Sequence, residues 1–196
     1  MPRTATIERN TRETQISLTI NLDGSGKAKI DCPVKFMTHM LELFARHGLF
    51  DLECKINGDT DVDYHHTMED LGLVLGEAIA KACGDKRGIR RYGSMILPMD
   101  ETLVLAALDL SGRPYLVYNV VPPAACVKDI DVCLFHEFFQ ALSVKAGMNL
   151  HFRMFESGEA HHLFEAMFKA FARALDEATG FDPRIEGQLP STKGVL

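Results

Sequence analysis

The chain has 196 residues, of which 46% are hydrophobic and 24% are charged, a balance typical of a globular protein with a sizeable core. The formal net charge is −6 and the sequence contains no basic run, so a nucleic-acid partner is disfavoured. No apolar stretch approaches the roughly 18 residues of a membrane helix, and the N-terminus has no signal-peptide core. We therefore expect neither a membrane nor a nucleic-acid partner.

The number and spacing of the cysteines indicate whether the protein resides in a reducing or an oxidising compartment of the cell. The chain has 5 cysteines, an odd number, and none of them forms a CxxC pair. Such a set favours free, buried thiols in a reducing environment over a disulfide framework or a thiolate metal site. We therefore expect a cytoplasmic protein.

Hydrophobic periodicity divides the first half of the chain into strands and helices. Residues 14–20 alternate between polar and apolar, as in a strand that is buried on one face. Gly48 and Gly84 each follow a run with helical spacing. In chain order, we predict a strand over 5–22, a strand over 27–31, a helix over 36–46, a strand over 49–56 and a helix over 65–82.

The second half repeats this order. Its predicted elements are a strand over 101–110, a strand over 115–121, a helix over 133–146, a strand over 148–155 and a helix over 161–179. At an offset of 88 residues (101 − 13), Glu13-Thr14 coincides with Glu101-Thr102, and Gly24 coincides with Gly112. We interpret the match as an internal duplication of a ββαβα unit.

The duplication predicts the organisation of the chain. The first half-repeat covers 1–90, the second covers 91–181, and a tail covers 182–196. Helices on one face of a mostly antiparallel sheet, twice over, predict an α+β fold in which two sheets sandwich four helices.

One short string occurs twice, as His65-His66-Thr67-Met68-Glu69 and as His161-His162-Leu163-Phe164-Glu165. Positions i and i+4 share one face of a helix, so the first His and the Glu of each string can hold one metal ion. The second His is rotated by about 100° and faces another partner. A single pair would equally fit a capped, solvated helix start. Two copies favour a site for two divalent metals, each bound by both strings.

The order of motifs resembles the imidazoleglycerol-phosphate dehydratase family over essentially the whole chain. The residues that carry the resemblance are Arg12-Glu13-Thr14, His39-Met40-Leu41, His65 to Asp70, Leu110 to Arg113, His161 to Glu165, Phe168-Lys169-Ala170 and Ser191 to Leu196. The resemblance implies a duplicated fold similar to the second domain of ribosomal protein S5. It also implies trimers that build a large homo-oligomer with shared active sites and two Mn²⁺ ions per site, although other divalent transition metals suit the same donors.

The resemblance further implies a lyase of histidine biosynthesis that dehydrates imidazole glycerol phosphate, a small phosphorylated substrate, to imidazole acetol phosphate. The C–H bond that breaks has no carbonyl beside it. A substrate ring held between two cations as imidazolate would expel the hydroxyl through a diazafulvene-like intermediate. The family pattern assigns Glu13 as the acid/base group. Without the resemblance, Glu13 would be interpreted as an exposed strand-edge residue.

The implied metal ligands are imidazoles and carboxylates, namely His39, His65, His66, Glu69, Glu137, His161, His162 and Glu165. Glu137 stands just before a Phe-Phe pair, where family members carry His or Glu, and its neighbour His136 is the alternative. In each string we expect the first His and the Glu on one ion and the second His on the other.

The implied phosphate ligands are hydroxyl and basic side chains, namely Arg91, Arg113, Lys169, Ser191 and Lys193. Arginine can bind phosphate bidentately and lysine supplies a point charge. Lys169 follows Glu165 by four residues, so it should border the metals. Arg90 is an alternative to Arg91, and Arg113 alone would pass as a turn residue.

Two departures from the family pattern surround His39. Thr38 stands where members usually carry Asp, and Leu43 stands where they usually carry Gln. The Asp would orient the metal-bound imidazole, so we expect an active enzyme with altered metal affinity or turnover. A dinuclear hydrolase that cleaves phosphoesters is the rival enzyme class. The S5-like fold also suggests an RNA-binding module, against which the acidic composition argues.

Overall fold

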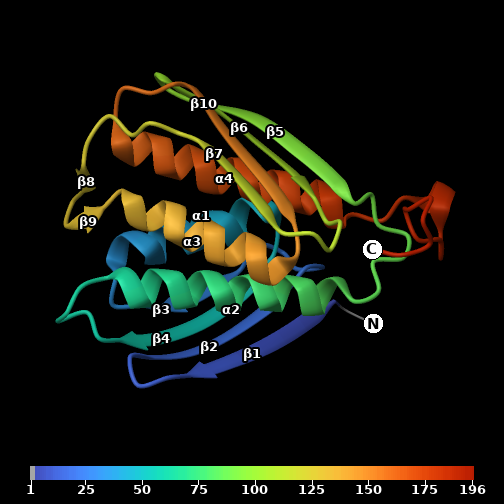
Figure 1. Cartoon of the computed structure of the whole chain (residues 1–196), viewed down its shortest axis with the longest axis horizontal. Helices are drawn as coiled ribbons and strands as arrows, with labels where there is room; N and C mark the ends of the chain where they lie inside the picture. The colour runs from blue at the N-terminus through green and yellow to red at the C-terminus, as the bar shows by residue number, and fades with distance from the viewer. Residues whose placement is uncertain (1–2) are drawn as a thin grey trace.

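The structure, a computed structural model, describes residues 3–196 and confirms the predicted α+β sandwich. Figure 1 shows two sheets that enclose four helices. The first sheet is built from β1 (Thr4–Asn10), β2 (Thr14–Asn21), β3 (Ala28–Asp31) and β4 (Asp51–Gly58), with the helices α1 (Lys35–Gly48) and α2 (His65–Cys83). The second is built from β5 (Tyr92–Met99), β6 (Thr102–Asp109), β7 (Tyr115–Asn119) and β10 (Asn149–Glu156), with α3 (Cys133–Ala146) and α4 (Ala160–Thr179).

The two sheets share one topology. Their strand orders are β1-β2-β4-β3 and β5-β6-β10-β7, and in each sheet two antiparallel ladders are followed by one parallel ladder. The remaining short elements are β8 (Cys126–Val127), β9 (Ile130–Asp131) and a 3₁₀ turn at Pro183–Ile185. Corresponding positions of the two halves can therefore be compared strand by strand.

Two strand predictions were wrong in detail. Residues 5–22 form a hairpin of β1 and β2, in which the amide of Thr14 donates to Thr11 Oγ1 at 2.9 Å. Inward-facing positions are odd in β1 and even in β2, and this change of phase is the sequence signal of the turn. Strand β5 was not predicted, so each half has one strand more than the expected unit.

The helices fill the space between the sheets. α2 lies against β1 and β2, α4 lies against β5 and β6, and the pairs α1–α4 and α2–α3 form the middle layer. Aromatic rings dominate this core, and the rings of Phe135 and Phe164 stack with centroids 3.8 Å apart. Within the described residues, no helix combines the length and the apolar character needed to cross a bilayer.

Helices α2 and α3 approach closely because α2 carries glycines at Gly72 and Gly76. A Cβ atom on Gly72 would lie 2.3 Å from the carbonyl oxygen of Phe138, and one on Gly76 would lie 2.4 Å from that of Leu142. Both neighbours are backbone atoms, so a larger side chain could enter only if the helices separated.

We predict that Gly72→Ala destabilises the protein. Alanine favours a helix by about 1 kcal/mol over glycine, but the forced separation of α2 and α3 should outweigh this gain, for a net loss of about 1–3 kcal/mol. The free energy of unfolding in denaturant measures the effect. Glu77→Ala, at an exposed position of the same helix, is the control and should be nearly neutral. A Gly72→Ala protein as stable as the parent would contradict the close packing.

Candidate active site

The His-bearing helices begin at one end of the sandwich, on the left in Figure 1. A carboxylate two residues ahead binds a backbone N–H at the start of three of them. The pairs are His65 N with Asp63 at 2.7 Å, Cys133 N with Asp131 at 3.0 Å, and His161 N with Glu159 at 3.3 Å. Such carboxylates satisfy amides that the helix itself leaves free. The histidine strings are therefore held at defined helix starts.

Three predicted ligands meet where α1 packs against α4. His39 Nε2 lies 3.4 Å from Glu165 Oε2, and His161 Nε2 lies 3.3 Å from the same oxygen. One donor atom from each of these residues falls within 4.8 Å of the other two. Two imidazoles and a carboxylate are a donor set suited to a divalent transition metal.

Glu165 is the most enclosed member of this cluster, with a side chain that is 11% exposed. Burial by itself raises the pKa of this carboxyl, but the Lys169 ammonium and His39 outweigh burial and hold the pKa below its ordinary value. Lys169 Nζ lies 2.5 Å from Glu165 Oε1. Lys169 therefore borders the cluster, as its i+4 spacing predicted.

The first string is arranged differently. His65 Nε2 and Glu69 Oε2 are 3.9 Å apart along α2. Within residues 3–196, no third ligand atom joins them to form a group with all donors within 4.8 Å of one another. Glu137 lies at the start of α3 with its carboxylate 3.3 Å from His136 Nδ1, so the choice between these two stays a prediction. The second string thus contributes to two groups of three donors, one with His39 and one in which His162 meets Asp100 and Glu101, whereas no such group within residues 3–196 includes His65 or Glu69.

The second histidine of each string contacts two carboxylates. His66 Nδ1 lies 2.9 Å from Asp59 Oδ2, and His66 Nε2 lies 3.8 Å from Glu13 Oε1. His162 Nδ1 lies 3.0 Å from Glu101 Oε2, and His162 Nε2 lies 3.3 Å from Glu159 Oε2. The predicted acid/base residue Glu13 is therefore beside one string.

These contacts raise the proton affinity of both histidines. The hydrogen bond with Asp59 raises the pKa of His66, and the hydrogen bond with Glu101 raises the pKa of His162. In turn, His162 lowers the pKa of the Glu101 carboxyl to about 2. Both imidazoles therefore hold a proton more tightly than a free histidine does in the absence of a metal.

Sequence reasoning missed three of these carboxylates, namely Asp59, Glu101 and Glu159. Asp59 lies in the loop between β4 and α2, which also contains Asp61 and Asp63, and nothing in the sequence distinguishes it from these two. Glu101 did have a signal, because the duplication aligns it with Glu13. That alignment served only as a landmark for the repeat.

The shared Glu-Thr motif also has a structural reason. The hydroxyl of Thr14 donates to Asp70 Oδ2, and Arg9 Nε lies 2.8 Å from Asp70 Oδ1. Asp70 is buried and follows Glu69 directly, so this anchor sets the rotation of α2 about its axis. It turns Asp70 inward and leaves the adjacent ligand position facing outward.

Thr38, one of the two departures beside His39, does not take over the role of the usual Asp. Its hydroxyl donates to the carbonyl of Cys32 at 3.5 Å. The orientation of His39 comes instead from Glu165 and from the ring of His161, whose centroid lies 6.0 Å away. Leu43 is partly buried and packs against the hydrophobic core.

Four of the predicted phosphate residues lie away from the metal ligands. Arg91 donates through Nε to Asp109 at 2.7 Å and through one terminal nitrogen to the carbonyl of Pro190 at 2.8 Å. Arg113 is mostly exposed near Asp109, and Lys193 donates its amide to Ser191 Oγ. Figure 1 places the C-terminal tail at the end of the sandwich opposite to the starts of α2 and α4. Their role toward phosphate stays a prediction.

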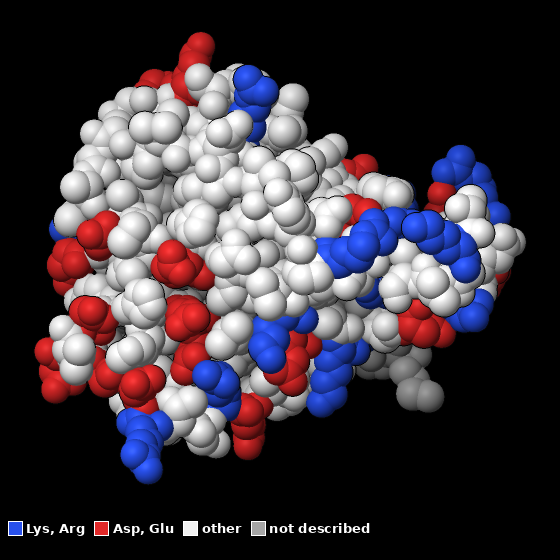
Figure 2. Space-filling model, viewed as in Figure 1, with Lys and Arg blue, Asp and Glu red and all other residues white. Residues whose placement is uncertain are grey.

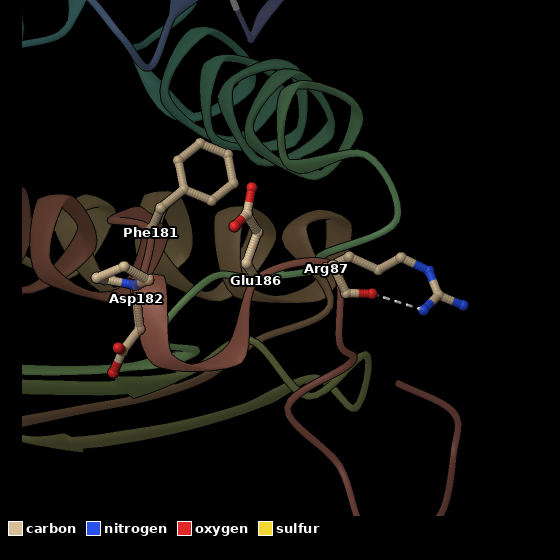
Figure 3. Close-up of a pocket in the computed structure, with 7 residues that line it drawn as sticks. Arg87, Phe181, Asp182 and Glu186 are labelled. Atoms are coloured by element: carbon tan, nitrogen blue, oxygen red, sulfur yellow. Dashed lines mark hydrogen bonds between the residues drawn. The ribbon is translucent and has the colours of Figure 1, made fainter.

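Two cavities bear on the search for a substrate site. One of about 500 Å³ adjoins His161 and is lined by Phe36, Cys126, Lys128 and Glu159 among others. The other, of about 410 Å³, lies beside the segment after α4, and Figure 3 shows Phe181 and Glu186 in its wall while the Arg87 side chain extends away. The second cavity contains no predicted site residue, so the first is the better candidate.

Comparisons with known proteins identify relatives of this chain. Residues 32–175 match the model of a family described as imidazoleglycerol-phosphate dehydratase. Proteins of that name from Pelobacter propionicus and Geobacter metallireducens are 59% and 57% identical over 196 residues, which cover 100% of each chain. The crystal structure of the Staphylococcus aureus enzyme is 36% identical, with a TM-score of 0.83 over 91% of this chain and 99% of that one. The Pyrococcus furiosus structure, in complex with (S)-C348, is 33% identical, with a TM-score of 0.83 over 97% and 100%.

We predict that Arg91→Lys loosens the tail. Lysine keeps the charge but cannot bind Asp109 and the Pro190 carbonyl at once, so the local opening of residues 189–196 should become easier by about 1–3 kcal/mol. Amide hydrogen exchange in the tail measures the change. Arg90→Lys is the matched control, because the Arg90 side chain is exposed. Equal tail protection in both variants would show that Arg91 does not anchor the tail.

Proposed function

The chain belongs to the imidazoleglycerol-phosphate dehydratase family, and from this premise we propose how its residues carry out the reaction. The proposed reaction converts imidazole glycerol phosphate to imidazole acetol phosphate and water, a step of histidine biosynthesis. The observation that carries the proposal is the convergence of His39, His161 and Glu165 on one point. The buried, free thiols of Cys32, Cys54 and Cys83 support a reducing, cytoplasmic location.

The donor set fits a pair of divalent cations, and we propose two Mn²⁺ ions per site. His39, His161 and Glu165 would hold one, while His65, Glu69 and Glu137 would hold the other. His66 and His162 would each cross to the opposite ion. When bound, the cations would stabilise the substrate ring as imidazolate, whose electrons would help to expel the hydroxyl from the side chain.

The protein itself must move a proton on the substrate side chain. Glu13 lies in the turn between β1 and β2, with Oε1 3.8 Å from His66 Nε2 and a side chain that is 53% exposed. Once the hydroxyl on the neighbouring carbon has taken up a proton and left as water, a carboxylate in this position can remove the proton from the C–H bond. The enol that results becomes the ketone product by a further proton transfer.

The distances within one chain support the proposal that active sites are shared between chains. α4 has 20 residues and is about 30 Å long at 1.5 Å per residue. His161 lies at its start, whereas Arg91 donates its amide to the carbonyl of Ala178 near its other end. Arg113 lies 3.9 Å from Asp109, the carboxylate that Arg91 also binds, and Figure 1 places the tail at that end of the sandwich. A three-carbon phosphate cannot span this length. If both groups bind one substrate, they must come from different chains.

The surface of the second sheet supports assembly of many copies. Its outward-facing side chains are mostly apolar and include Tyr92, Ile96, Leu103, Leu105, Val117 and Phe155. The outward-facing positions of the first sheet are polar and include Thr6, Glu8, Ser17, Glu53, Lys55 and Asn57. Figure 2 shows few charged atoms over the second sheet and many over the lower part of the molecule. An apolar face of this kind favours contact with a second copy, so we propose trimers that build a large homo-oligomer.

We predict that Glu13→Gln lowers turnover by about 10²–10⁴-fold while the metal content stays normal, because the amide cannot accept the proton. Formation of the ketone from imidazole glycerol phosphate is the assay, with metal analysis of the same sample. Glu8→Gln, an exposed carboxylate on β1, is the control.

The same assay separates the rival function. A dinuclear hydrolase would release inorganic phosphate from this substrate and would form no ketone. Phosphate release, or loss of metal from the Glu13→Gln protein, would contradict the assignment of Glu13 as acid/base in a dehydratase.

We also predict that a chelator lowers the mass of the assembly. Ligands that come from two chains join those chains only while metal is bound. The apolar sheet contact needs no metal, so the expected product is a smaller oligomer rather than a free chain. Sedimentation before and after chelation, and after Mn²⁺ is restored, measures the change. An unaltered sedimentation profile would exclude metal-dependent contacts between the chains.

A further inference from the structure

The contacts of His66 and His162 show an exchange of roles between the two halves. Each half supplies one carboxylate from a hairpin turn, Glu13 or Glu101, and one from the segment before the helix, Asp59 or Glu159. At His66, the residue before the helix faces Nδ1 and the hairpin residue faces Nε2. At His162 the hairpin residue faces Nδ1 and the residue before the helix faces Nε2.

One contact is the same in both halves. In each half, the Nδ1 atom of the histidine lies within hydrogen-bond distance of a carboxylate oxygen. The distances are 2.9 Å for His66 with Asp59 and 3.0 Å for His162 with Glu101. Asp59 and Glu101 are not copies of each other, since the duplication pairs Glu101 with Glu13. The same contact is thus made by residues of different origin, which indicates that the contact itself is needed.

The position of Asp59 is also energetically unfavourable for one of its oxygens. Its second oxygen, Oδ1, is buried and has no hydrogen-bond partner within residues 3–196. A buried carboxylate oxygen without a partner is unfavourable, and folds keep such atoms chiefly where they serve a function. The contact with His66 is a function that would explain why Asp59 is retained in this position.

We infer that Asp59 and Glu101 are positioning residues that orient His66 and His162 for metal binding. Each carboxylate accepts the proton of Nδ1–H, so the imidazole is fixed as the tautomer that carries its lone pair on Nε2, the atom through which it would bind a metal and which here faces Glu13 in one half and Glu159 in the other. The inference rests on the metal site proposed above. It also explains why Glu13, and not its copy Glu101, is available as the acid/base group: Glu101 is engaged with Nδ1 of His162, whereas Glu13 lies on the Nε2 side of His66.

The test is an electron-paramagnetic-resonance titration of the metal-free, full-length protein with Mn²⁺, which measures free and bound ion directly. Asp59→Ala and Glu101→Ala should each weaken binding of Mn²⁺ by about 10–100-fold. Asp59→Asn and Glu101→Gln should retain most of the affinity, because an amide oxygen still accepts from Nδ1–H. Asp61→Ala is the control, since it removes an exposed charge from the same loop.

The outcomes separate the two proposals. A parent protein that binds no Mn²⁺ would overturn the metal site and this inference together. A parent that binds Mn²⁺ while Asp59→Ala and Glu101→Ala bind it equally well would overturn the inference alone. An equal loss in Asp61→Ala would assign the effect to general charge and would also overturn it. Glu101 is 41% exposed, so its alanine variant should fold even if the variant at Asp59 does not.

Discussion

The packing of α1 against α4 sets the spacing of the three residues that we propose as ligands of one metal ion. His39 belongs to one helix and His161 with Glu165 to the other, so their separation is set by the side chains between the two helices. The rings of Phe44 and Phe171 stack between them with centroids 5.6 Å apart, and deeper rings continue the contact. Because such a core is packed as densely as a crystal, it holds the ligands within narrow limits before any ion arrives.

The two halves of the fold each carry a histidine string at the start of a helix, but the donors around the two strings are arranged differently. Both halves also have the same strand order. Three donors meet in one version, whereas His65 and Glu69 stand as a pair in the other. The carboxylates of the hairpin turns also differ, since Glu101 contacts Nδ1 of a histidine and Glu13 does not. After duplication, one glutamate could orient a ligand while the other was free to act on the substrate.

Much of the fold could be predicted from the sequence, because the periodicity of the helices and the repeated landmarks are local signals. The division of residues 5–22 into two strands was missed because both strands alternate, and only the change of phase at the turn reveals it. In the site, the i+4 spacing correctly placed Lys169 and His161 beside Glu165. The contact of His39 with Glu165 joins residues 126 apart, and spacing along the chain carries no information on it.

The missed carboxylates show a second limit. Asp59 is one of several acidic residues in its loop, and only the folded chain shows which of them reaches an imidazole. Arg91 shows the reverse, since a residue expected to bind phosphate is engaged with Asp109 and the tail within its own chain. Hydrogen bonds between distant segments decide both cases.

The apolar face of the second sheet has a consequence for the newly made chain. Until a neighbour covers it, this face exposes Tyr92 and Ile96, each more than half accessible to water, on an edge strand. An uncovered apolar edge strand is the kind of surface that drives aggregation and that chaperones retain. If copies of the chain cover this face, as proposed, the yield of native protein should depend on how fast copies accumulate as well as on how well each one folds.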